Sequence, residues 1–246
     1  MKLSEFKELA KQQLSYMLED DYKIQHIDSC IILNRKTKNG NEKIEIPYLK
    51  NYGFVFDINP PRCAKRFDEV ETHLVEVFTR ETLNRQHTIS NFANENYVPE
   101  GLEWWRNDGG DMIRFNFKKE EAIMLYFDYV KAYYYNEVLP FFAKYNSVET
   151  VYNQIAGPLR KLDFNIINYD YENLIGFLNP EGSRKPSFRL IILLHLFSDE
   201  LFQEYYKSVL NDINKSIIEN GYYNDIEDKN SLVQLYENLK TVPRIK

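Results

Sequence analysis

Two hydrophobic patterns are segregated along this chain, and they restrict its fold class. Alternation typical of strands comes before residue 118, and helical spacing dominates after it. Asn39-Gly40 separates two apolar runs, which is a strong β-hairpin signal. Strands early and helices late predict an α+β fold. We expect an antiparallel sheet of about four strands from the N-terminal half, with helices packed on it and a helical C-terminal part. The expected strands cover 24–33, 44–48, 52–58 and 112–117.

Apolar spacing and capping signals predict the helices. Asn146 with Glu149 predicts an N-terminal cap, Gly221 a C-terminal cap, and Pro140 a bend or an end. The expected helices cover 3–18, 67–78, 118–139, 146–156, 171–178, 198–221 and 231–239, and residues 85–108 are expected to form a loop with short structured pieces. We expect one domain over 1–246, with 159–246 as an alternative helical subdomain.

Composition excludes several classes of protein. The 246 residues carry a net charge of −6, which disfavours a generic nucleic-acid-coating surface. An aromatic share of 15% argues against intrinsic disorder. The N-terminus has no secretory h-region, and the longest apolar run, 188–197, is too short to span a bilayer. Two cysteines without CxxC spacing favour a reduced pair. We therefore expect a cytoplasmic protein that binds neither nucleic acid nor membrane.

Motifs of known chemistry are missing. The sequence has no phosphate-binding glycine loop, no nucleophile elbow and no metal-ligand cysteine spacing. Glu69 and His73 share one helical face and could ligate a metal or position a base, but a second histidine at helical spacing is absent. A solvent-facing pair explains them better. We predict no catalytic residues, no metal site and no cofactor.

Aromatic clusters offer two interpretations each. The adjacent Trp104 and Trp105, followed by Arg106 and Asp108, either form a partner or ligand surface or plug the base and edge of the sheet. The stripe of Tyr126, Tyr129 and Tyr133 is best explained as core, with hydroxyls reaching water or carbonyls; Tyr134 and Tyr135 extend it.

The charged clusters also have two interpretations each. Arg62, Lys65 and Arg66 are expected near a helix N-terminus, where they either hold a small anion or are solvated or paired with Asp68 and Glu69. The segment 198–240 has nine acidic residues against four lysines, which favours either a basic partner or a solvated face.

The order of elements resembles a family of bacterial domains of unknown function, of the DUF4304-like type. The residues that carry the resemblance are 52–59, Trp104-Trp105, 138–142 and 147–149, and it covers roughly residues 1–156. The resemblance implies a fold type and brings no catalytic residues with it.

These observations lead to two functional hypotheses. The first is a non-catalytic protein-binding module of accessory or immunity type, supported by acidic charge, the tryptophan pair and the lack of a catalytic constellation. The alternative is a small-molecule-binding protein or enzyme with a site between the sheet and the 85–111 loop. Its candidate polar groups are His73, His87, Arg106 and Asp108. The oligomeric state is left open.

Overall fold

The predicted α+β class is confirmed by a computed structural model of the chain. It describes residues 3–27, 29–48, 56–78, 88–107, 110–115, 120–159, 185–221 and 223–245. The chain divides into two compact units, each described by itself. The first unit is Met1–Lys65 with Asn91–Lys144, and the second is Arg66–Ser90 with Tyr145–Lys246. The helical part predicted from residue 159 falls wholly within the second unit.

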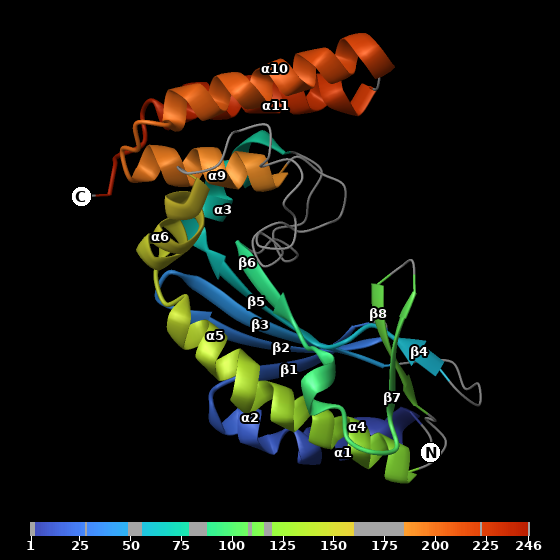
Figure 1. Cartoon of the computed structure of the whole chain (residues 1–246). Helices are drawn as coiled ribbons and strands as arrows, with labels where there is room; N and C mark the ends of the chain where they lie inside the picture. The colour runs from blue at the N-terminus through green and yellow to red at the C-terminus, as the bar shows by residue number, and fades with distance from the viewer. Residues whose placement is uncertain are drawn as a thin grey trace. The chain divides into compact units, whose positions relative to one another are not determined.

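The main sheet has five strands rather than about four (Figure 1). The order is β1-β2-β3-β5-β6, with β5 ending and β6 beginning in the second unit. The predicted hairpin is confirmed, but its turn is Lys38-Asn39 rather than Asn39-Gly40, because Thr37 pairs with Gly40, the first residue of β3. Strand bounds are β1 Lys23–Ile27, β2 Cys30–Thr37, β3 Gly40–Pro47, β5 Arg62–Phe67 and β6 Ile89–Phe92.

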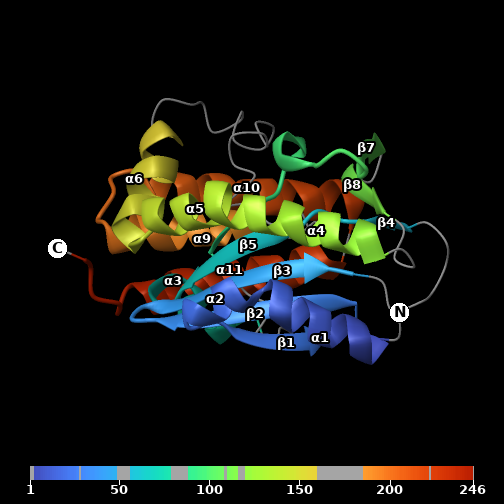
Figure 2. The same ribbon diagram turned by 90° about the horizontal axis from the view of Figure 1, so that it is seen from below.

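Helices of the first unit cover one face of this sheet, as Figures 1 and 2 show. They are α1 (Leu3–Gln13), α2 (Ser15–Glu19), α4 (Glu120–Tyr133) and α5 (Leu139–Lys144). Paired positions of β2 and β3 lie on one face, and Ile31, Leu33, Ile44 and Ile46 are fully buried there. Phe6, Ala10 and Leu14 of the first helical segment are buried as well. Burial of these apolar faces is the main stabilising term of the unit.

The tyrosine stripe of α4 is core, as predicted. Tyr126, Tyr129 and Tyr133 are buried, and their hydroxyls donate to the carbonyls of Pro47 (2.7 Å), Asn94 (3.0 Å) and Asn91 (2.9 Å), respectively. Each hydroxyl thus satisfies a backbone acceptor that packing has removed from water. The stripe therefore ties α4 to β3, to β6 and to Asn94, which follows β6.

Pro140 does not end its helix. The π-helical turn η3 (Tyr134–Val138) separates α4 from α5, and Pro140 is the second residue of α5. Proline has no N–H and its ring crowds the carbonyl four residues earlier, so a wider turn just before it relieves the clash. Asn136 Nδ2 donates to the Ala132 carbonyl at 2.8 Å. The side chain thereby supplies a donor where the regular ladder is interrupted.

Part of the predicted loop forms a strand of a second sheet. It has the order β4-β8-β7, with β4 Phe56–Ile58, β8 Gly110–Phe115 and β7 Glu103–Asn107. The 3₁₀ turn η2 (Glu95–Tyr97) precedes β7 in the chain. The tryptophan pair therefore lies on a strand and not in a loop. Asp108-Gly109 between β7 and β8 is the sequence signal that predicts this hairpin.

The second unit is largely helical. Its described helices are α3 (Asp68–Val77), α6 (Val148–Leu159), α9 (Lys185–Leu196), α10 (Phe202–Asn220) and α11 (Tyr223–Leu239). Gly221 ends α10 in the left-handed region at φ 64°, as predicted. The N-cap of α6 is Ser147 rather than Asn146, since Ser147 Oγ accepts from the Thr150 N–H at 3.1 Å.

Several further predictions of secondary structure were wrong or lie outside the described residues. The last helix begins at Tyr223 and not at Ser231, and α9 was not predicted. Arg62, Lys65 and Arg66 lie on β5 and not in a first helical turn, although Arg66 comes two residues before α3 begins at Asp68. The predicted helix 171–178 lies outside the described residues, as does the part of the third predicted strand before residue 56.

Candidate functional site

The cross-strand pairing of β7 with β8 sends the two tryptophans to opposite faces. Trp104 pairs with Ile113, which is fully buried, and its ring meets Tyr129 of α4 edge to face at 6.5 Å. Trp105 pairs with Met112 on the other face. Side chains alternate along a strand, so only one member of the pair can enter the core. Trp104 is on the core side, where it is half-buried, and Trp105 is half-buried on the other face.

The outer face around Trp105 combines an aromatic ring with charge. The Arg114 guanidinium carbon lies 5.3 Å from the Trp105 ring centroid, and Arg114 Nη1 lies 3.3 Å from Glu103 Oε2. The side chains of Arg114 and Glu103 are 37% and 60% exposed. We call Glu103, Trp105, Met112 and Arg114 the Trp105 face. Tryptophan and arginine are the residue types enriched where binding energy concentrates in protein interfaces.

The other predicted site residues belong to the second unit or have side chains outside the described part of the chain. His73 lies on α3 in the second unit, where its Nδ1 is 3.9 Å from Glu76 Oε2. Arg106 is on β7, paired with Asp111, but its side chain lies outside the described residues. Asp108 and His87 also lie outside them. The small-molecule or enzyme site stays a prediction, and so does the resemblance-based fold family.

Among the described residues, no group of three or more His, Cys, Asp or Glu side chains is arranged to hold a metal ion. Glu69 and His73 both lie on α3, and both are half-buried rather than solvent-facing as predicted. Cys30 and Cys63 are free thiols. Burial raises the pKa of each to about 12, so both thiols stay protonated and unreactive near neutral pH.

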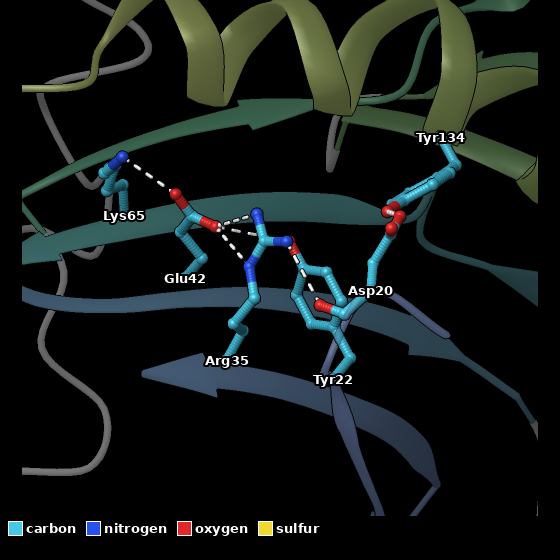
Figure 3. Close-up of polar contacts among 6 residues, drawn as sticks. All are labelled: Asp20, Tyr22, Arg35, Glu42, Lys65 and Tyr134. Carbon is cyan, nitrogen blue, oxygen red and sulfur yellow. Dashed lines mark hydrogen bonds and ion pairs between the residues drawn. The ribbon is translucent and has the colours of Figure 1, made fainter. Parts of the chain in front are cut away.

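A buried charge network in the first unit was not predicted (Figure 3). Arg35 donates to Glu42 Oε2 through Nε (3.0 Å) and Nη2 (2.6 Å), and Lys65 Nζ donates to Glu42 Oε1 at 2.8 Å. Arg35 also donates to the Asp20 carbonyl at 3.1 Å and lies over the Tyr22 ring. Both carboxylate oxygens of Glu42 are thus engaged by cations.

The chemistry of this network is structural. Tyr22 donates to Glu42, and Tyr134 donates to the side chain of Asp20. Burial raises the pKa of both tyrosines, with the neighbouring carboxylates adding to the effect, so their hydroxyls stay protonated. Fixed cations paired with a carboxylate and protonated phenols provide neither a nucleophile nor a base. The network joins α2 and η3 to β2, β3 and β5.

Glu137, on the π-helical turn, collects a second set of polar contacts in the first unit. Its carboxylate accepts from Asn91 Nδ2 (3.5 Å), Asn94 Nδ2 (3.3 Å) and Tyr97 OH (3.0 Å). The hydrogen bond from Tyr97 to the Glu137 carboxylate raises the pKa of Tyr97. These donors are neutral and come from β6 and η2, so the cluster fixes that segment against η3. The scattered Asn and Tyr positions gave no local sequence signal.

The acidic C-terminal segment is partly engaged within the second unit. Asp225 accepts from Ser216 at 2.7 Å, Glu237 pairs with Lys240 at 2.6 Å, and Glu219 lies 3.8 Å from Lys215. Asp199 accepts from Tyr152 and from the Leu201 N–H. These contacts leave less of the acidic charge available to attract a partner than the net count suggests.

The chain was compared with known proteins in three ways. No family model, no curated protein and no solved structure matches it. None of the described helices is both long and apolar enough to cross a membrane. The functional argument therefore depends on the surfaces and contacts of this chain alone.

Proposed function

We propose that this protein is a non-catalytic module, of accessory or immunity type, that binds another protein through the Trp105 face. The observation that carries the proposal is the placement of Trp105 opposite the core, beside Arg114. Trp104 meets Tyr129 of α4, and Trp105, the next residue of the strand, lies on the opposite face of β7. A second large aromatic that faces away from the core adds apolar surface whose burial favours association.

The position of β7 suggests how a partner binds. Among the described strands, β7 has a neighbour on one side only, since it is the last strand of the β4-β8-β7 sheet. Edge strands present backbone donors and acceptors that a strand from another chain can pair with. A partner strand along Glu103–Asn107 would place one of its side chains beside Trp105. Backbone pairing would give affinity and the Trp105 face would give specificity.

The test is partner capture with matched variants. Tagged wild-type protein is used for affinity capture from host lysate, and captured proteins are quantified by mass spectrometry. Trp105→Ala should reduce recovery of a specific partner by at least about tenfold, because loss of a central tryptophan typically costs over 2 kcal/mol. Tyr135→Ala is the control, since Tyr135 is a large aromatic of the first unit that is 48% exposed and lies outside the Trp105 face.

The outcomes separate the hypotheses. Recovery lost in Trp105→Ala and kept in Tyr135→Ala, with both variants folded by circular dichroism, supports the proposal. Equal recovery by both variants would place the contact elsewhere. If wild-type protein captures no specific partner, the proposal is wrong and the small-molecule alternative becomes the one to pursue by ligand screening.

A further inference from the structure

The end of the chain is attached to α9 of the second unit by two hydrogen bonds. His195 Nε2 lies 3.2 Å from the Val242 carbonyl, and the Ile245 N–H donates to the Leu196 carbonyl at 2.7 Å. We call residues 242–245 the C-terminal segment; Figure 1 shows it beside the end of α9. Because a carbonyl can only accept, the imidazole must carry its proton on Nε2.

His195 is in an environment that suits only the neutral ring. The residue is 5% exposed, and its ring meets Phe202 of α10 edge to face at 5.2 Å. Its other nitrogen, Nδ1, is buried without a hydrogen-bond partner among the described residues. Protonation would place an N–H and a positive charge at Nδ1 with no acceptor there. A buried, unpaired charge of this kind is strongly disfavoured.

The charged and titratable groups around the ring add to this penalty. Arg244 lies on the C-terminal segment itself and His73 on α3, and both oppose a positive charge on His195. On the side of α10 the ring meets Phe202, which is itself stacked on Tyr236 of α11. On α9, Arg189 is paired with Glu71. Burial is the largest effect that lowers the pKa of His195, and only the Val242 contact raises it.

We propose that His195 and the C-terminal segment form an acid-sensitive latch. The neutral imidazole holds the segment against α9, and protonation releases it, because the cation is repelled by Arg244 and gains water only when the segment leaves. The inference does not depend on the proposed binding function. The sign follows from linkage: a histidine with a lowered pKa in the closed state stabilises closure above its ordinary pKa, and that stability is lost as pH falls.

The Ile245 amide reports the latch directly, since its hydrogen bond exists only when the segment is closed. Amide exchange is followed by NMR and corrected for the pH dependence of the chemical step. On going from about pH 7.5 to about pH 5.5, the opening constant should rise by at least about threefold and up to about tenfold. The Ile213 amide, within α10, is the internal reference for global opening.

Variants distinguish the latch from general acid sensitivity. His195→Phe keeps a ring beside Phe202 but cannot titrate, so Ile245 exchange should lose its pH dependence. His26→Phe is the matched control, because His26 also has a pKa lowered by burial but lies in the first unit; the pH dependence should remain. Arg244→Gln removes the like charge and should raise the pKa of His195.

Two results would overturn the proposal. One is wild-type Ile245 exchange that follows the Ile213 reference at every pH. The other is pH dependence that persists in His195→Phe. Should His195→Phe fail to fold, the wild-type ring is titrated by NMR instead. Its pKa must then lie below the ordinary value of about 6.5 and coincide with the lower end of the Ile245 transition.

Discussion

Replacing Glu71 by glutamine should destabilise the second unit more than any surface change. Glu71 is completely buried on α3. Its carboxylate accepts hydrogen bonds from Arg189 of α9, from Nε at 2.8 Å and from Nη2 at 3.0 Å. Thr88 also donates to it at 2.9 Å. Glu71→Gln leaves the Arg189 charge buried and turns an acceptor into a second donor that faces it. Breaking a buried pair by removing one partner costs about 3–5 kcal/mol.

The double variant Glu71→Met with Arg189→Met tests whether the unpaired buried charge causes the loss of stability. Replacing both charges by apolar side chains removes the unpaired charge as well as the pair, and such exchanges are often neutral or stabilising. The double variant should therefore be more stable than either single variant. The matched control is Glu219→Gln, which breaks the exposed pair with Lys215 on α10 and should cost no more than about 0.5 kcal/mol.

Urea unfolding measures these differences. Both tryptophans lie on β7 in the first unit, so tryptophan fluorescence follows that unit while circular dichroism follows helices in both. A loss of 3–5 kcal/mol should lower the circular dichroism midpoint by at least about 1 M urea. The reasoning is refuted if Glu71→Gln costs less than about 1 kcal/mol, or if the double variant is as unstable as the sum of the singles.

Two further predictions concern the first unit. Burial would raise the pKa of Glu45, but hydrogen bonds from Arg62 and Lys43 hold it at about 2. The ionised carboxylate therefore stabilises the folded unit above the unfolded pKa of about 4.3, and this stabilisation is lost as pH falls from about 5 toward 2. Glu45→Gln should therefore flatten the acid limb of a stability–pH curve measured by urea unfolding; an unchanged limb would contradict this. Gly101 has φ +101°, and an added Cβ would lie 2.9 Å from Leu125 Cδ1. Gly101→Ala should lower stability by about 1–3 kcal/mol in thermal or urea unfolding, and a neutral result would mean that the turn before β7 relaxes freely.

Local patterns predicted those parts of the fold that depend on local interactions. The hairpin of β2 and β3, the buried tyrosine stripe and the cap at Gly221 are each determined by residues a few positions apart. The missed strand β5 is different. Its sequence, Arg62-Cys63-Ala64-Lys65-Arg66-Phe67, has charges where alternation would require apolar residues. Lys65 can be buried only because Glu42, 23 positions earlier, lies opposite it.

The candidate site was predicted in part for the same reason. Two adjacent tryptophans are visible in the sequence, but which one enters the core depends on the register of β7 with β8. The Arg189–Glu71 and Lys65–Glu42 pairs join residues 118 and 23 positions apart, and no periodicity indicates such partners. His195 lies within the apolar run 188–197, and no local pattern indicates that Val242, 47 positions later, lies beside it.

The positions of the basic residues also bear on the class of partner. Arg62, Lys65 and Arg66 form the one basic cluster that the sequence offered as a small-anion site. In the structure each contacts a carboxylate: Arg62 binds Glu45, Lys65 binds Glu42 and Arg66 binds Asp68. An anion would have to displace a carboxylate already held at hydrogen-bond distance, two of them substantially buried. Pairing with Asp68, which the sequence suggested for this cluster, is confirmed for Arg66. The cluster therefore stabilises the sheet, and a search for a partner is better directed at the Trp105 face than at phosphate-bearing ligands.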